Sequence, residues 1–383
     1  MSPEMKLNIG LPSYEIIDQE SKNGNAVFLV RPKNDSRPKG RYQRRVRHLD
    51  CLGDPSVLVV NTHRYECLDC QRSFYPALPD ILKYRHSSEA FRRFIYEQHH
   101  FGVPCSTLFE RQGIGQASIE RFYQEFTIRK ASERLSQTYP QYLGIDEHTL
   151  HKGKRLVTTF CDLKNHRVFE LFQGRSSSDL STFLSQLKGR EQVKMVCIDL
   201  SSTYRAIVKK WFPNAKIVAD RFHVVRVIFQ HFIKLATQIL PEIKNHRGYL
   251  LCLRKNPKNL TQTQKKRLEH LFHLAPAIQP FYQNMHQLRD LMNLKHQKAK
   301  ACRKHAYKLY EWIDKLQQSN FTQLITLAKT LDKWAEPIAC MWRFTLSNGI
   351  TEGFHRKMKL IQRRAFGFKN FQNYRLRVIA QCG

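Results

Sequence analysis

The chain has few acidic residues for its basic content. Its 383 residues include 32 Asp plus Glu against 64 Lys plus Arg, which gives a formal net charge of +32. Hydrophobic residues make up 42% of the chain, which is enough for a globular core. We therefore expect a polyanionic partner. Nucleic acid is favoured, because each neutralised phosphate releases condensed counterions and so adds affinity.

The chain also lacks a long apolar run and a regular pattern of cysteine pairs. It has no candidate membrane span, no lipidation motif beside its basic helices, and no signal peptide in its first residues, MSPEMKLNIG. The ten cysteines are scattered, with one close pair, Cys67 and Cys70. This usage indicates a reducing compartment, so we expect a cytoplasmic protein that binds no membrane.

Residues 1–85 read as a small, loop-rich module with short strands. A basic tract at 37–49 contains Arg41, Arg44 and Arg45, which are candidates for contacts to phosphates. A solvated charged loop is the alternative, because charge runs usually face water.

Cys67 and Cys70 have the CxxC spacing of a zinc knuckle. A closed tetrahedral zinc site needs two more ligands. The candidates stand at irregular spacing: His48, Cys51 and His63. A zinc-finger-like module and two buried free thiols both remain open at this point.

Residues 86–135 contain three helical patterns in short succession, which is the rhythm of a helix-turn-helix. The third pattern predicts a buried stripe made of Ile119, Phe122, Tyr123 and Phe126. The opposite face carries polar residues that could read base edges: Gln116, Ser118, Arg121 and Gln124. A plain three-helix linker domain is the alternative.

Residues 136–235 change to strands. Three strand patterns at 141–150, 154–163 and 166–173 precede a helix, a buried strand at 193–200, a second helix and a last strand at 215–220. Three meandering strands followed by alternating helix and parallel strand predict an α/β fold with a ribonuclease-H-like mixed sheet. Several mixed α/β folds share parts of this order.

The rest of the chain is helical. We expect residues 236–340 to form a helical insertion outside the sheet, with breaks around Pro257, Pro276 and Pro280 and a basic stretch at 293–308. Residues 341–383 are expected to return to the core with an amphipathic helix after Ser347-Asn348-Gly349.

Two acids stand on apolar strands, Asp146 and Asp199. A buried carboxylate costs several kcal/mol without a compensating cation. If the two strands are parallel neighbours, both aspartates face one site, and Glu352 on the later helix could complete it. Such carboxylates suit the hard divalent cations that assist phosphodiester cleavage. Singly, each acid has a structural alternative: a helix cap, a partner of a core lysine, or an ordinary first-turn glutamate.

Asp220 and His223 are auxiliary candidates, for a metal or for DNA. Asp220 could equally cap the following helix, and His223 could be a core histidine. Glu147 should point to the opposite face of its strand from Asp146. Basic residues that follow Glu352 could hold DNA phosphates: Arg356, Lys357, Arg363 and Arg364.

Three stretches resemble the ISL-three family of bacterial insertion-sequence transposases: GIDEHTLHKGKRLVTTFCDL, VCIDLSSTYRAIVKKWFPNAKIVADRFHVV and SNGITEGFHRKMKLIQRRAFGFKNFQNYRLR. They run in the family's order. The resemblance implies a ribonuclease-H-like catalytic domain with a helical insertion between the second and third acids. It also implies that Asp146, Asp199 and Glu352 bind Mg²⁺ or Mn²⁺.

The resemblance further implies an N-terminal zinc finger and a helix-turn-helix that recognise terminal inverted repeats. The sequence departs from this pattern, because no earlier cysteine pair occurs around AVFLVRPKNDS, so only Cys67 and Cys70 match. His355 stands where an asparagine is more typical.

The expected function is therefore that of a DDE-type DNA transposase, which cleaves element ends and joins them to target DNA, with a homodimer on paired ends as its plausible form. Two alternatives remain from the residues. One is a silent DNA-binding regulator or transposase relic, and the other is a nuclease of similar fold that does not join strands.

Overall fold

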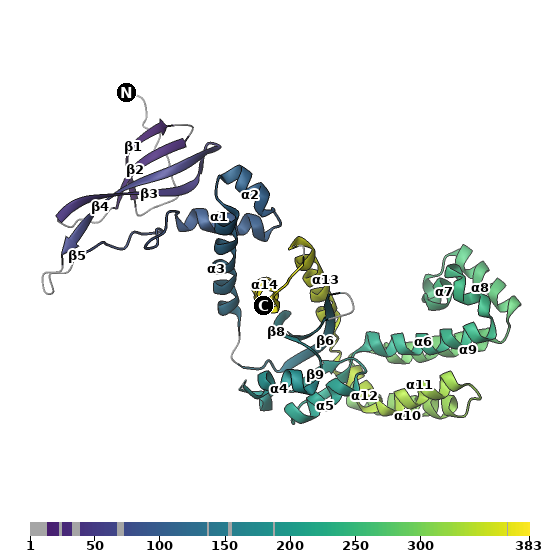
Figure 1. The fold of residues 1–383 in the computed structure, drawn as a ribbon. Coiled ribbons are helices and arrows are strands. Elements are labelled where there is room, and N and C mark those ends of the chain that lie inside the picture. Colours follow the sequence, from purple (N-terminus) through teal and green to yellow (C-terminus); the bar gives the residue numbers. More distant parts are fainter. Residues whose placement is uncertain are drawn as a thin grey trace. The chain divides into compact units, whose positions relative to one another are not determined.

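Contacts within the computed structural model divide the chain into two units, Met1–Lys130 and Ala131–Gly383 (Figure 1). The structure describes residues 14–22, 25–32, 39–66, 73–135, 138–151, 155–186, 188–365 and 367–383. No helix in these ranges is both long enough and apolar enough to cross a membrane.

The first unit begins with a five-stranded sheet in the order β1-β2-β4-β3, with β5 paired to β4. Its strands are β1 (Tyr14–Lys22), β2 (Asn25–Pro32), β3 (Lys39–Cys51), β4 (Asp54–Glu66) and β5 (Ser73–Phe74). Alternating apolar residues build its core: Phe28, Val30, Val46, Leu58 and Val60. The hairpin of β3 and β4 turns at Leu52 and Gly53, both of which have positive φ.

The prediction of a loop-rich module with short strands is therefore wrong, because β3 and β4 are 13 residues long each. The basic tract lies on β3 rather than in a loop. Arg41 and Arg45 are exposed there. Arg44 instead donates to the backbone carbonyls of Leu82 and Arg85, so its guanidinium stabilises the fold.

The predicted zinc ligands are only partly within the described chain. Cys67 and Cys70 lie outside the described residues. His48 is buried, and its Nδ1 lies 2.8 Å from the Ser88 hydroxyl. Zinc binding thus has no support in the part of the chain that the structure describes.

Three helices complete the first unit: α1 (Glu89–His100), α2 (Cys105–Gln112) and α3 (Gln116–Arg134). The predicted stripe of α3 is confirmed as buried: Ile119, Phe122, Tyr123 and Phe126. On the other face, Gln116, Arg121 and Gln124 are exposed and Ser118 is half-buried. The fully buried Arg92 pairs with Glu89 and Glu125, which ties α1 to α3.

The second unit contains a mixed sheet in the order β10-β9-β6-β7-β8. The strands are β6 (Tyr142–His151), β7 (Arg155–Asp162), β8 (Arg167–Gln173), β9 (Met195–Ile198) and β10 (Lys216–Ala219). The first three form an antiparallel meander, and β9 and β10 run parallel to β6. The predicted order of strands is confirmed.

Helices cover both faces of this sheet (Figure 1). One pair is α4 (Ser177–Gln186) and α5 (Ser202–Trp211), which contact β8 and β9. The other pair is α13 (Gly349–Arg364) and α14 (Phe371–Cys382), which contact β6, β7 and β8. Gly144 meets α13, whereas its near neighbour Glu147 meets Tyr204 of α5, so alternate residues of β6 face opposite layers.

Between β10 and α13 the chain is helical, and we call residues 221–344 the helical arm. Its α-helices are α6 (Arg221–Ile239), α7 (Arg247–Arg254), α8 (Gln262–Leu274), α9 (Ile278–Met292), α10 (Ala299–Gln317), α11 (Thr322–Lys333) and α12 (Ala335–Phe344). Short 3-10 helices lie at Arg190–Gln192 before the arm and at Pro241–Asn245 and Pro257–Asn259 within it.

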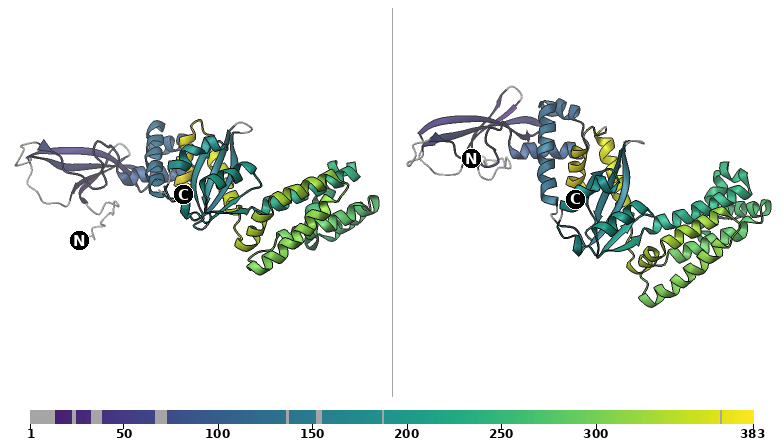
Figure 2. Two further views of the ribbon diagram at one scale, coloured as in Figure 1. Left: turned by 90° about the horizontal axis from the view of Figure 1, so that it is seen from below. Right: turned by 60° about the horizontal axis from the view of Figure 1, so that its bottom comes forward.

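The arm is built from helices that run side by side (Figure 2). Helix α6 packs against α9 and α11, α10 packs against α11 and α12, and α12 contacts β10. The predicted breaks are confirmed around Pro257 and at Pro276, whereas Pro280 itself lies in the first turn of α9, where a missing N–H costs little.

Gly144 allows α13 to approach β6 closely. A Cβ atom at this position would lie 2.8 Å from Asn348 Oδ1, 2.8 Å from Leu163 Cδ2 and 3.1 Å from Thr351 Oγ1. These neighbours are held in a packed interior, so only the absence of a side chain at residue 144 permits the contact.

We expect Gly144→Ala to lower the free energy of unfolding by about 1–3 kcal/mol, because overpacking forces these neighbours apart. Urea denaturation followed by circular dichroism measures the change. Gly353→Ala is the matched control: an added Cβ there meets no described atom within 4 Å, and alanine is favoured inside a helix. Equal stability of the two variants would contradict the close packing of α13.

Candidate functional site

Three aspartates stand level with one another, Asp146 on β6 and the other two directly after the ends of β9 and β10. Ile145 of β6 is paired with Ile198 of β9, which is paired with Ala219 of β10. In parallel strands the paired residues are level, so the residues that follow them form a row, Asp146, Asp199 and Asp220. The prediction that the strands leading to Asp146 and Asp199 are parallel neighbours is confirmed. We call the three aspartates the aspartate row.

The aspartate row concentrates negative charge in a partly buried place. Burial raises the pKa of Asp146 to about 6, with the charges of Asp199 and Asp220 acting in the same direction. Burial also raises the pKa of Asp199. The charge of His223 opposes both rises, and its own pKa is raised, first of all by its hydrogen bond to Asp220. The row therefore favours a cation beside it.

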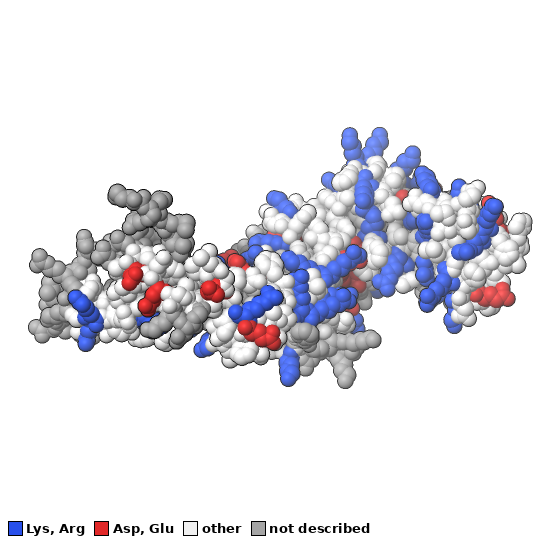
Figure 3. Space-filling view, turned by 90° about the horizontal axis from the view of Figure 1, so that it is seen from above, with Lys and Arg blue, Asp and Glu red and all other residues white. Residues whose placement is uncertain are grey.

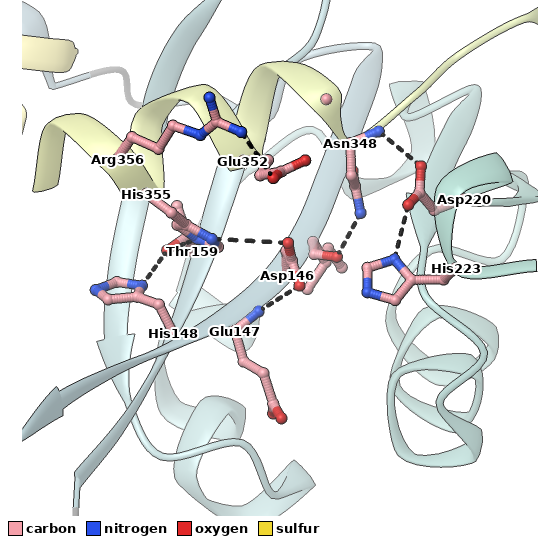
Figure 4. A network of polar contacts seen from close by, with 12 residues as sticks. Asp146, Glu147, His148, Thr159, Asp220, His223, Asn348, Glu352, His355 and Arg356 are labelled. Carbon is pink, nitrogen blue, oxygen red and sulfur yellow. Dashed lines mark hydrogen bonds and ion pairs between the residues drawn. The ribbon is translucent and has the colours of Figure 1, made fainter. Parts of the chain in front are cut away.

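The carboxylate of Asp220 joins α6 to the turn before α13. Asp220 occupies the N-cap position of α6, but its side chain accepts no bond from that helix's first backbone amides. Its carboxylate instead accepts from His223 Nδ1 at 2.7 Å and from the Asn348 backbone N–H at 3.1 Å (Figure 4). The alternative that Asp220 caps α6 is thus confirmed for its position, and its backbone carbonyl accepts from the Val224 N–H, but its carboxylate takes no part in the cap. His223 is not a fully buried core histidine either, because 26% of its side chain is exposed.

Asn348 connects the sheet to the helix that carries Glu352. Its side-chain N–H donates to the carbonyl of Ile145 at 3.1 Å, and its own carbonyl accepts from the Glu352 N–H at 2.8 Å. Asn348 is 2% exposed. The start of α13 is thus held against β6 beside Asp146. Sequence reasoning treated this asparagine only as part of the segment before the helix, although a polar residue just before a helix with a candidate acid was a usable signal.

Glu352 lies on the first turn of α13 and is exposed. Its carboxylate accepts from Arg356 at 3.3 Å. Among the described residues, no three His, Cys, Asp or Glu side chains are grouped in an arrangement that could hold a metal ion. The structure therefore brings Asp146 and Asp199 together and places Glu352 on an adjoining element. An exposed ion pair such as that of Glu352 with Arg356 contributes only about 0–1 kcal/mol, so it does not hold the Glu352 side chain in one position.

Two neutral histidines lie behind Asp146. Thr159, which is level with Asp146 on β7, has its hydroxyl 3.2 Å from His148 Nδ1 and 3.3 Å from His355 Nε2 (Figure 4). Burial lowers the pKa of His148 to about 3 and that of His355 to about 4. His355 Nδ1 is 3.7 Å from Asp146 Oδ2, too far for a hydrogen bond. At neutral pH these rings add no positive charge.

Sequence reasoning did not identify His148 or Thr159. The available signal was the strand period, because His148 stands two residues after Asp146 and so shares its face of β6. The same period placed Glu147 correctly on the opposite face, where it accepts from the Tyr204 hydroxyl at 3.2 Å.

The basic residues predicted on α13 are exposed: Arg356, Lys357, Arg363 and Arg364. Lys357 donates to the carbonyl of Gln381 at 2.6 Å, which ties α13 to α14. Their contact with DNA, like that of Arg121, stays a prediction.

We expect Asn348→Ala to lower the free energy of unfolding by about 1–3 kcal/mol, because the buried carbonyl of Ile145 loses its donor. Chemical denaturation of this variant, beside Asn320→Ala at an exposed asparagine, measures the effect. Unchanged stability of Asn348→Ala would show that the joint contributes nothing to the docking of α13.

Comparison with known proteins identifies the family. Residues 143–378 match a transposase family of the ISL-three type. The transposase for insertion sequence element IS1001 of Bordetella parapertussis is 28% identical over 361 residues, 88% of this chain and 84% of that protein. The transposase for insertion sequence element IS1557 of Mycobacterium tuberculosis is 23% identical over 260 residues, 60% and 57% of the two chains. The family match spans more than half of the chain and includes the aspartate row and α13, so the chain belongs to the ISL-three family of insertion-sequence transposases.

Proposed function

We propose that the chain is a DDE-type DNA transposase that binds the ends of its element, cleaves the DNA and joins the freed strand to a target. Asp146, Asp199 and Glu352 are its catalytic acids. The observation that carries the proposal is the aspartate row, in which two partly buried carboxylates stand level at neighbouring parallel strands within the matched family region.

The donor set fits Mg²⁺ or Mn²⁺, which prefer carboxylate oxygens. The raised pKa of Asp146 shows that its charge is poorly compensated, and a divalent cation would supply the missing compensation. Asp146 and Asp199 would hold such ions from the sheet, and Glu352 would do so from α13. When bound, the cations would stabilise the charge that develops on the attacking and leaving oxygens of the phosphodiester.

Other residues of the site position these acids. Asp220 and Asn348 hold the start of α13 against β6, so they determine where Glu352 stands. The neutral His355 forms no ion pair with Asp146, so it does not compete with a cation for this carboxylate. On the exposed side of α13, Arg363 and Arg364 are suited to DNA phosphates.

We further propose that the mixed sheet is a ribonuclease-H-like catalytic core. An antiparallel meander followed by two parallel strands on its β6 side, with helices on both faces, supports this assignment. In the first unit, α1 to α3 would act as a helix-turn-helix, with Gln116, Arg121 and Gln124 exposed toward a DNA groove.

Neutralising the acids is expected to abolish joining without abolishing DNA binding. Asp146→Asn, Asp199→Asn and Glu352→Gln should each reduce strand transfer of a pre-cut element end to the protein-free background in Mg²⁺, because each loses a cation ligand. Gel retardation should show that binding of the same DNA is kept, since the net charge hardly changes.

Glu147→Gln is the matched control for these variants. It removes an acid beside Asp146 that faces the other layer, so joining should persist. Full activity in any of the three acid variants would contradict the assignment of that residue. Cleavage by wild type without joined product would indicate a nuclease, and DNA binding with neither step would indicate a silent regulator.

The stability of the protein should report cation binding independently of catalysis. The rise of the Asp146 pKa from 3.8 to about 6 corresponds to a cost of up to about 3 kcal/mol for carrying this charge at neutral pH. Without divalent cations, Asp146→Asn should therefore unfold at a higher temperature than wild type. Added Mn²⁺ should raise the melting temperature of wild type and leave that of Asp146→Asn nearly unchanged.

Asp314→Asn, at an exposed acid of α10, is the control and should respond to Mn²⁺ as wild type does. Scanning calorimetry measures all three proteins. An equal response of Asp146→Asn and wild type would place the cation elsewhere.

A further inference from the structure

The helical arm carries a basic surface that the catalytic proposal does not use. It occupies the segment before α10 and the first half of that helix, and we call it the arm face: Lys295, Lys298, Lys300, Arg303, Lys304, Tyr307 and Lys308. All seven side chains are exposed. Tyr307, at the centre of the helical part, is 73% exposed. In Figure 3, Lys and Arg side chains gather over the arm, at the right of the view, with few Asp and Glu among them.

Within the described residues, no acidic side chain forms an ion pair with the cations of the arm face. No acid occurs in the sequence between Asp290 and Glu311. The positive charge of this surface also acts on His305 of α10, whose pKa is lowered by burial and then by the charges of Lys308 and Lys304.

The spacing of the cations is unfavourable for the helix itself. Lys300, Lys304 and Lys308 follow one another at intervals of four residues, so they lie on one side of α10, about 6 Å apart along its axis. Like charges at this interval destabilise a helix. A row of cations kept at such spacing fits a polyanion, whose charges recur along its length. Tyr307 lies among them, and a tyrosine hydroxyl can donate to a phosphate oxygen.

The arm face begins beside the two turns that join the arm to the aspartate row. The His296 N–H donates to the Thr345 hydroxyl at 2.9 Å, and the Gln297 N–H donates to the carbonyl of Trp342 at 3.0 Å. Thr345 comes three residues before Asn348. On the other side, Arg221, the neighbour of Asp220, donates to the carbonyl of Leu294 at 2.8 Å. The basic segment is thus fastened to both turns that join the arm to the aspartate row.

We propose that the arm face binds the phosphate backbone of double-stranded DNA that continues from the scissile phosphate. This inference rests on the proposed function and extends it, because it assigns the helical arm a role in holding DNA. The contacts are to phosphates, so the surface adds affinity at any DNA sequence and selects none.

The triple variant Lys300→Ala, Lys304→Ala, Lys308→Ala of the full chain tests the arm face. Fluorescence anisotropy with a 40-base-pair duplex of arbitrary sequence gives the dissociation constant at several salt concentrations. If each lysine neutralises one phosphate, the slope of log affinity against log salt should fall by up to about 2.7, and affinity at 0.1 M salt should weaken tenfold or more.

The matched control is Lys258→Ala, Lys265→Ala, Lys266→Ala, which removes the same charge from exposed positions elsewhere on the arm. Its affinity should stay within about threefold of wild type. An unchanged slope for the first triple variant would overturn the proposal. Equal losses in both triple variants would also overturn it, because they would reflect net charge alone.

Two further measurements keep the outcomes separate. The single variant Lys304→Gln, expected to lower the slope by about 0.9, replaces the triple variant if circular dichroism shows that the latter is misfolded. Wild type that neither binds DNA nor joins a pre-cut end would contradict the proposed function itself. Wild type that does both, beside an arm-face variant with an unchanged slope, would contradict the arm face alone.

Discussion

The three carboxylates of the aspartate row must stand together, one on β6 and one at the end of each of β9 and β10. Much of the second unit serves this constraint. Burial and repulsion by neighbouring carboxylates both oppose the ionisation of Asp146 and Asp199. The structure offsets part of the cost with backbone N–H donors, since Asp146 accepts from Glu147 at 2.8 Å and Asp199 accepts from Ser201 at 3.1 Å. Asp220 takes its donors from α6 and from the turn before α13. The negative charge that remains on the aspartates is the charge that a divalent cation would neutralise if the proposed function is correct.

The same aspartates explain how a long helical arm can interrupt the core. The bond from the Asn348 N–H to Asp220 joins residues that are 128 positions apart, at the two ends of the arm. Arg221 adds bonds to the carbonyls of Met292, Leu294 and Met341. Because the ends of the arm are fixed to each other and to β6, the helices between them can vary without moving α13. A buried charged group makes a suitable clasp, since losing one partner leaves the other unsatisfied.

The sequence predicted the parts of the site that depend on local pattern. Asp146 and Asp199 were identifiable because an acid within an apolar strand is unusual, and the strand order followed from periodicity. Asn348 was not recognised, because its partners are distant in the chain, and a hydrogen bond of this kind leaves no periodic signal. The length of the strands in the first unit was underestimated for another reason. On β3 several outward positions are basic, as Arg45 is beside the buried Val46. The sequence of this strand therefore resembles a charged loop until its pairing with β4 is known.

The net charge of the chain is positive, whereas the charge of the aspartate row is negative. This difference couples the binding of DNA to the binding of the cation. A net charge of +32 attracts DNA from a distance, whereas the aspartate row repels a phosphate at contact. On the proposed function, a divalent cation removes that local repulsion, so each partner should bind more tightly when the other is present. The neutral His148 and His355 preserve the contrast, because protonated rings would weaken cation binding at Asp146. An asparagine in place of His355 would likewise be uncharged, so this departure from the family pattern leaves the electrostatic balance of the site as it was.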